Sequence, residues 1–164
     1  MVKKTSILLI VLFLFLFSAN LARAEFFWST NKKACENIGS FSLKDIFGRE
    51  LSLDEHIGTA PLLLVFWTTW CPYCRQTIKE LAEIASDSEN LQIKLILINV
   101  GEKESPVRRF LAQFKDNPFI ILFDSQGKLS RDCRVKGIPT FVVIDKSGEV
   151  EFAGNYLPEN YLKR

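Results

Sequence analysis

Two cysteines three positions apart, Cys71 and Cys74, stand where an apolar run gives way to a helical pattern. Residues 61–67 are all apolar, and apolar side chains recur at helical spacing from Pro72 onward. Two thiols at a helix start can close into a small disulfide and reopen. The unpaired N–H groups and the dipole of the helix favour the thiolate of the first cysteine. The spacing therefore predicts a dithiol redox centre.

The main alternative for a C-x-x-C pair is half of a zinc site, which needs two further cysteine or histidine ligands at suitable spacing. The chain offers only Cys35, Cys133 and His56, which are widely separated and form no second paired motif. We therefore expect no metal and no cofactor. The chemistry is expected to come from the thiols themselves.

A second motif, Ile138-Pro139, stands just before the apolar run 141–144. An X-Pro bond at the start of a strand is a natural place for a cis peptide. Together with the C-x-x-C pair and its flanking Trp67 and Trp70, this motif resembles the thioredoxin superfamily, in which a cis-proline faces the cysteine pair. The chain is most similar to the TlpA/ResA-like branch of extracytoplasmic thiol-disulfide oxidoreductases.

The resemblance covers roughly residues 38–155 and rests on several segments in the same order as in that branch. They are the hairpin 41–53, the run 62–74, residues 98–102, and residues 137–150. The resemblance implies an α/β chain with a thioredoxin-like fold, in which helices flank a mixed central sheet and a β-hairpin comes first. The pattern predicts, after the hairpin, strand 61–67, helix 72–85, strand 92–100, helix 105–114, strand 119–123, helix 129–133, strands 140–145 and 149–152, and a short final helix from Pro158.

The order of these elements predicts which residues meet. A right-handed crossover makes strands 61–67 and 92–100 parallel, so Cys71 and Glu102 should lie at one edge of the sheet. An antiparallel strand 140–145 would bring Pro139 to the same edge. There the Ile138 backbone could pair with an extended substrate segment. The expected substrate-binding rim is formed by Trp70, Pro72, Tyr73, Ile138 and Pro139.

The expected mechanism is attack of the Cys71 thiolate on a disulfide, followed by resolution of the mixed disulfide by Cys74. The reverse path would oxidise a substrate. The acidic residues that the resemblance leads one to expect near the second thiol are replaced by Thr77 and Val65. Glu102 is then a candidate proton relay, and the alternative is an ordinary solvated glutamate.

Cys35 and Cys133 bring the cysteine count to an even number, and an oxidising compartment would tend to pair them. Some TlpA-like proteins have a second bridge of this kind, so we predict a structural disulfide. The alternatives are a free regulatory thiol at Cys133 and two buried, unpaired cysteines.

The N-terminal residues 1–24 are expected to be a signal peptide. Lys3 and Lys4 precede an uncharged, largely apolar stretch, and the triplet 22–24 fits a cleavage site before Glu25. An uncleaved membrane anchor is the alternative. Residues 25–37 are expected to be an irregular extension, and residues 38–164 a single thioredoxin-like domain. We expect a periplasmic or other extracytoplasmic location, either soluble after cleavage or anchored to the cytoplasmic membrane.

The charge balance points away from nucleic acid. Loss of residues 1–24 lowers the basic count from 21 to 18, against 19 acidic side chains, and leaves no basic patch. The pairs Lys32-Lys33 and Arg108-Arg109 are interpreted as solvated faces. Membrane contact is expected only if the N-terminal segment stays uncleaved.

The leading functional hypothesis is an exported enzyme that reduces disulfides of extracytoplasmic proteins, as in cytochrome c maturation. The expected partners are disulfide- or dithiol-containing proteins and a membrane or soluble redox protein that recharges the site. The alternatives are a DsbA-like disulfide oxidant or isomerase and a redox-inactive binding or chaperone module.

Overall fold

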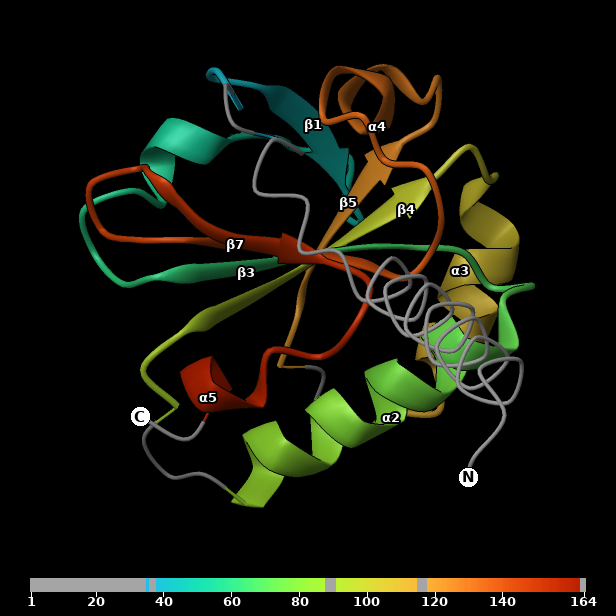
Figure 1. The fold of residues 1–164 in the computed structure, drawn as a ribbon. Coiled ribbons are helices and arrows are strands. Elements are labelled where there is room, and N and C mark those ends of the chain that lie inside the picture. The colour runs from blue at the N-terminus through green and yellow to red at the C-terminus, as the bar shows by residue number, and fades with distance from the viewer. Residues whose placement is uncertain (1–34, 36–37, 88–90, 115–117, 163–164) are drawn as a thin grey trace, which may run out of the picture.

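The computed structural model describes residues 35, 38–87, 91–114 and 118–162 (Figure 1). These residues form a seven-stranded sheet in the order β2-β1-β5-β4-β3-β6-β7. The strands are β1 (Ser42–Asp45), β2 (Glu50–Ser52), β3 (Leu62–Trp67), β4 (Lys94–Val100), β5 (Ile120–Asp124), β6 (Thr140–Ile144) and β7 (Val150–Gly154). The sheet is mixed and begins with a β-hairpin, as the sequence predicts.

The three central strands, β3, β4 and β5, run parallel to one another, and the other neighbouring pairs are antiparallel. Every residue of β3 is buried, because helices or loops cover both faces of the sheet. Trp67 at the end of β3 pairs with Asn99 of β4, and Phe66 pairs with Thr140 at the start of β6. The ends of β3 and β4 and the start of β6 therefore meet at one edge.

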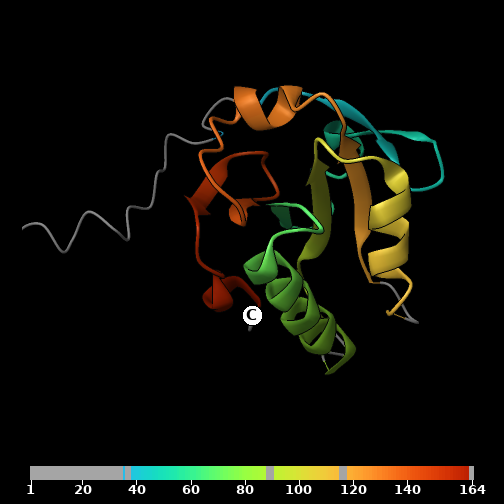
Figure 2. The ribbon, with the colours of Figure 1, turned by 90° about the vertical axis from the view of Figure 1, so that its right-hand side faces the viewer.

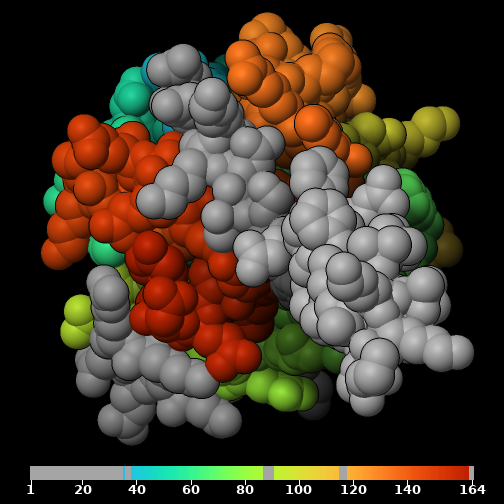
Figure 3. All heavy atoms as spheres, in the orientation of Figure 1, coloured from blue at the N-terminus to red at the C-terminus, as the bar shows by residue number. Residues whose placement is uncertain are grey.

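Helices cover the two faces unequally. The helices are α2 (Pro72–Asp87), α3 (Glu104–Leu111), α4 (Lys128–Asp132) and α5 (Glu159–Leu162). One core cluster packs side chains of α2, α3 and α5 against the sheet, and the other includes Leu129 of α4 with Leu53 of a short 3-10 turn. Figures 1 and 2 show α4 on the opposite side of the sheet from α2 and α5. In Figure 3 the C-terminal part of the chain, coloured red, forms one continuous surface on the face shown.

Helix α3 begins slightly earlier than its sequence pattern suggests. The sequence pattern starts this helix at residue 105, but the N-cap is Lys103, whose side chain makes no capping hydrogen bond. Pro106 therefore occupies the third helical position. Proline is tolerated there, because the first N–H groups of a helix have no partner within it. The helix then ends at Leu111, about one turn before the expected end at Phe114.

The expected signal peptide and most of the expected extension lie outside the described residues. Within the part of the chain that the structure describes, no helix is long and apolar enough to cross a membrane. The same residues contain no cluster of three or more potential metal ligands.

Candidate active site

Cys71 and Cys74 lie at the start of α2, directly beyond the end of β3. The backbone N–H of Cys74 donates a hydrogen bond to Cys71 Sγ at 3.2 Å. Both residues are free thiols. Cys71 retains 5% of its surface and Cys74 retains none, so only the first cysteine borders solvent. This arrangement suits an attacking thiol at Cys71 and a resolving thiol at Cys74.

Burial, as the largest cause, and the side-chain hydrogen bond with Cys71 together raise the pKa of the Cys74 thiol to about 12. A hydrogen bond from the Thr68 backbone acts in the opposite direction and lowers this pKa. Removal from water disfavours the thiolate, so Cys74 is a neutral thiol at physiological pH. Its proton must leave before Cys74 can act as a nucleophile.

The Ile138–Pro139 peptide bond is cis, and its loop faces the cysteine pair. The Cys71 thiol donates a hydrogen bond to the Ile138 carbonyl, with Sγ and O 3.8 Å apart. The side-chain amide of Asn155 donates to the Pro139 carbonyl at 2.9 Å and to Thr140 Oγ1 at 3.2 Å. Asn155, just after β7, therefore fastens the cis-proline loop to the end of the sheet.

A groove of about 510 Å³ lies between the first turns of α2, the cis-proline loop and the segment after β7. Tyr73, Ile138 and Pro139 line it. Tyr73 is 76% exposed and Trp70 is 70% exposed. Exposed aromatic side chains around a partly apolar groove are typical of a surface that binds another polypeptide. Trp67, in contrast, is fully buried against Phe110 of α3.

Glu102 lies at the same edge, and its carboxylate is held by two neighbours. It accepts hydrogen bonds from the Thr69 backbone N–H at 2.7 Å, from the Thr69 hydroxyl at 2.6 Å, and from Asn99 Nδ2 at 2.7 Å. The glutamate is thus not an ordinary solvated side chain. Its contacts fix the turn before Cys71, whereas a role as proton relay stays a prediction.

The two positions without the expected acid differ in their surroundings. Val65 is fully buried in β3, while Thr77 is partly exposed on α2 and lines the groove beside the cis-proline loop. Three buried polar atoms at this edge have no partner among the described residues: Trp67 Nε1, Thr68 Oγ1 and Asn99 Oδ1. Such atoms are commonly satisfied by ordered water.

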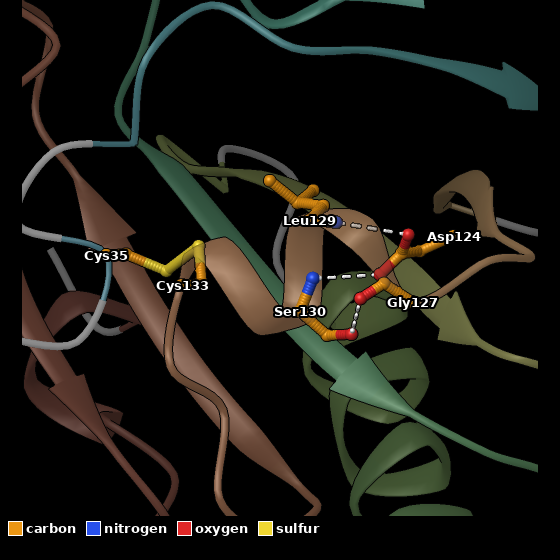
Figure 4. The surroundings of a disulfide bond; sticks show 6 residues. All are labelled: Cys35, Asp124, Gly127, Leu129, Ser130 and Cys133. Carbon is orange, nitrogen blue, oxygen red and sulfur yellow. Dashed lines mark hydrogen bonds between the residues drawn. A yellow bond between two sulfur atoms is a disulfide. The ribbon is translucent and has the colours of Figure 1, made fainter.

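Cys35 and Cys133 are joined by a disulfide, and both residues are buried. The bond lies at the C-terminal end of α4, while the Asp124 carboxylate accepts backbone hydrogen bonds from Leu129 and Ser130 at the other end (Figure 4). The backbone N–H of Cys35 also donates to the Cys133 carbonyl at 3.2 Å. Cys35 is therefore fastened to the end of α4, which leads toward the cis-proline loop.

Several residues of the site carry little or no signal in the sequence. Asn99 could have been noticed, since it is the one amide in the otherwise apolar run 95–100. Thr69 and Asn155 belong to loops, and Arg75 lies on the exposed face of α2, where such residue types are ordinary. Their contacts depend on how distant segments pack.

A cysteine pair at a helix start, with a buried second thiol and a facing cis-proline on a mixed α/β sheet, defines the class of thioredoxin-like thiol-disulfide oxidoreductases. The comparisons with known proteins agree. The AhpC/TSA family matches residues 34–153, and the chain belongs to this family. "Thiol-disulfide oxidoreductase ResA" of Geobacillus thermodenitrificans is 31% identical over 132 residues, which cover 78% of this chain and 73% of that protein.

Solved structures of similar proteins have the same fold. A putative thiol:disulfide interchange protein DsbE from Chlorobium tepidum is 27% identical with a TM-score of 0.65, covering 81% of this chain and 90% of that one. A secreted Mycobacterium tuberculosis disulfide oxidoreductase, described as homologous to E. coli DsbE, is 25% identical with a TM-score of 0.62, covering 71% and 84%. The chain is therefore a thioredoxin-like oxidoreductase of the ResA/DsbE type.

Proposed function

We propose that this chain is an exported protein-disulfide reductase in which Cys71 is the nucleophile and Cys74 the resolving thiol. The observation that carries the assignment is the asymmetry of the pair. Cys71 borders solvent at the helix start, whereas Cys74 is fully enclosed and has a pKa of about 12. A substrate disulfide can reach only the first sulfur.

The reaction balances over two exchanges. The Cys71 thiolate attacks one sulfur of the substrate disulfide, forms a mixed disulfide, and releases the other sulfur as a thiolate. Cys74 then loses its proton and attacks Cys71 Sγ, which releases the second substrate sulfur and leaves a Cys71–Cys74 disulfide. Two electrons pass to the substrate. A dithiol-bearing redox protein must return them before the next cycle.

The state of Cys74 is compatible with the reducing direction. Strong disulfide oxidants have a dithiol form that is stabilised, as when the thiolate of the attacking cysteine is held at low pKa. A resolving thiol with a pKa of about 12 supplies no such stabilisation at neutral pH. The reducing direction is proposed from the resemblance to the ResA-like branch, and the reduction potential of the couple decides between a reductase and a DsbA-like oxidant.

The groove beside Pro139 suits an extended polypeptide substrate. Proline has no N–H, and the Ile138 backbone next to it can pair with a substrate strand once the Cys71 thiol, which donates to the Ile138 carbonyl in the free protein, reacts with the substrate. Trp70, Pro72 and Tyr73 would cover the other side of the substrate. The substrates we propose are disulfide-containing extracytoplasmic proteins, among them proteins that mature by binding haem c.

Export is proposed from the sequence of residues 1–24, and the similar Mycobacterium tuberculosis disulfide oxidoreductase is a secreted protein. N-terminal sequencing of the exported protein tests it. A mature chain beginning at Glu25 is expected, and a chain that keeps residue 1 and fractionates with membranes would instead indicate an anchor.

The reduction potential of the Cys71/Cys74 couple tests the direction. We expect a value more negative than about −200 mV, together with dithiothreitol-driven reduction of an oligopeptide disulfide. A potential near about −120 mV would indicate an oxidant. Binding of disulfide-containing partners without any thiol-dependent turnover would indicate a redox-inactive binding module.

A further inference from the structure

A second groove, of about 330 Å³, lies on the other flank of the active-site helix. Helices α2 and α3 and the turn before Cys71 form its walls. It is lined by Thr69, Arg75, Pro106, Arg109, Phe110 and Gln113. The groove beside the cis-proline loop is instead lined by α2 residues such as Tyr73 and Thr77. The first turns of α2 therefore separate two grooves, and the cysteine pair lies at the head of that helix.

Two guanidinium groups dominate the second groove. The Arg75 guanidinium lies 5.5 Å from the centre of the Phe110 ring, and Arg75 and Arg109 are both exposed. The ion pairs found among the described residues involve neither arginine. Arg108 pairs with Glu104 at 2.8 Å, whereas Arg109 is exposed, as expected of a solvated face, and also lines the groove.

No carboxylate is among the described residues that line this groove. Glu102 contacts Thr69 at the groove wall and keeps its charge, but its two oxygens accept three hydrogen bonds from Thr69 and Asn99 and form no ion pair with either arginine. The groove itself therefore carries two positive charges on a chain whose mature form carries nearly equal numbers of basic and acidic groups. Arginine favours carboxylate partners, because its planar fork of donors matches the two oxygens.

Two residues that line the groove are also close in sequence to the active-site cysteines. Thr69 precedes Cys71 by two residues, and Arg75 directly follows Cys74. A polypeptide whose disulfide lies over Cys71 and whose one arm pairs beside Ile138 would direct its other arm toward the two arginines.

We propose that this second groove binds an acidic segment of the protein substrate, with aspartate or glutamate side chains a few residues from the reactive cysteine. The inference rests on the proposed function and adds the substrate class. Arg75 and Arg109 then act as specificity-determining residues that bind substrate away from the sulfur chemistry. Attraction of this kind accelerates association and weakens as salt is added.

Two disulfide peptides that differ only in glutamate or glutamine beside the cysteine test the proposal. The wild-type protein should reduce the glutamate peptide with a kcat/KM about fivefold higher at low ionic strength, and about 0.5 M sodium chloride should remove most of the difference. Arg109→Gln should bring the ratio of the two kcat/KM values close to one. Arg75→Gln should lower it as well. Arg109→Lys, which keeps the charge without the fork, should retain part of it.

Lys79→Gln is the matched control. It removes one exposed positive charge from α2, the helix that carries Arg75, at a position that does not line the groove. This variant should keep the wild-type ratio of kcat/KM for the glutamate peptide to kcat/KM for the glutamine peptide. Equal kcat/KM values for the two peptides with the wild-type protein would overturn the acidic-segment proposal. Equal losses in Lys79→Gln and Arg109→Gln would overturn it too, by showing an effect of overall charge. No turnover of either peptide would instead overturn the proposed reductase function.

Discussion

Glu102 clasps Thr69 through both the backbone N–H and the side-chain hydroxyl, at 2.7 and 2.6 Å. The two residues are 33 positions apart, and Thr69 stands two residues before Cys71. The contact ties the loop after β4 to the turn before Cys71, the proposed attacking thiol. Asn99, buried at the end of β4, donates to the same carboxylate at 2.7 Å and completes the clasp. The position of Cys71 thus depends on a neighbouring strand as well as on its own helix.

Replacing Glu102 should therefore act through the geometry of the turn. Glu102→Ala leaves several donors without a partner and should lower the free energy of unfolding by about 1–3 kcal/mol. It should also lower kcat/KM about tenfold or more, since misplaced nucleophiles react slowly. Glu102→Gln should have a modest effect, because an amide can accept from the two N–H groups and donate to the Thr69 hydroxyl. Urea unfolding measures the change in stability, and the rate of peptide reduction measures the change in kcat/KM. A Glu102→Gln variant as slow as Glu102→Ala at full stability would favour the proton-relay role.

The missing acid near Cys74 should limit the rate of resolution. Thr77 is one helical turn beyond Cys74 and borders the groove, so Thr77→Glu places a carboxylate close to the resolving thiol. We expect an increase in reductase rate at neutral pH of at least about tenfold, below the roughly 100- to 10,000-fold that a well-positioned general base contributes. Thr77→Gln is the matched control, with nearly the same shape and no charge. If Thr77→Glu leaves the pH–rate profile unchanged, deprotonation of Cys74 does not limit the reaction.

The raised pKa of Cys74 predicts how the stability of the reduced protein changes with pH. In the unfolded chain this thiol ionises near its ordinary pKa of 9.0, whereas the folded protein keeps the proton up to about pH 12. The folded state therefore binds more protons between these values, and its stability falls as the pH rises through them. The free energy of unfolding of the reduced wild type, minus that of Cys74→Ala, should decrease between about pH 8 and about pH 11. A constant difference would show that Cys74 ionises alike in both states.

The disulfide between Cys35 and Cys133 joins residues 98 positions apart in the sequence. Closing a loop of this size lowers the conformational entropy of the unfolded chain. The double variant Cys35→Ala, Cys133→Ala should lose about 2–5 kcal/mol of unfolding free energy while keeping its Cys71 chemistry. Non-reducing peptide mapping of the exported protein should find these two cysteines joined. If Cys35 and Cys133 are both freely alkylated in the native protein, they do not form a structural disulfide.

The sequence predicts the strands well, because uninterrupted apolar runs such as 61–67 leave few alternatives in a small α/β domain. It predicts Cys71, Cys74 and the cis Ile138–Pro139 bond for a similar reason, since each belongs to a short motif. The start of α3 is less certain from sequence, as Pro106 fits any position of a first helical turn.

The parts of the site that the sequence does not predict are pairings between distant segments. The contact of Glu102 with Thr69 depends on how two parallel strands align, and no spacing rule contains it. The groove with Arg75 and Arg109 likewise arises only when α2 packs beside α3. Helical periodicity shows that both arginines are exposed, but it does not show that they share a groove.

The division of labour between the two active-site thiols is the central claim, and trapping the mixed disulfide tests it most directly. The Cys74→Ser variant, incubated with a disulfide peptide, should accumulate a covalent adduct that mass spectrometry locates on Cys71. Cys71→Ser should form no adduct and show no turnover, while the wild type reduces the peptide with dithiothreitol and keeps no adduct. An adduct on Cys74 in the wild type, or reduction by Cys71→Ser at the wild-type rate, would contradict the assignment of Cys71 as the nucleophile.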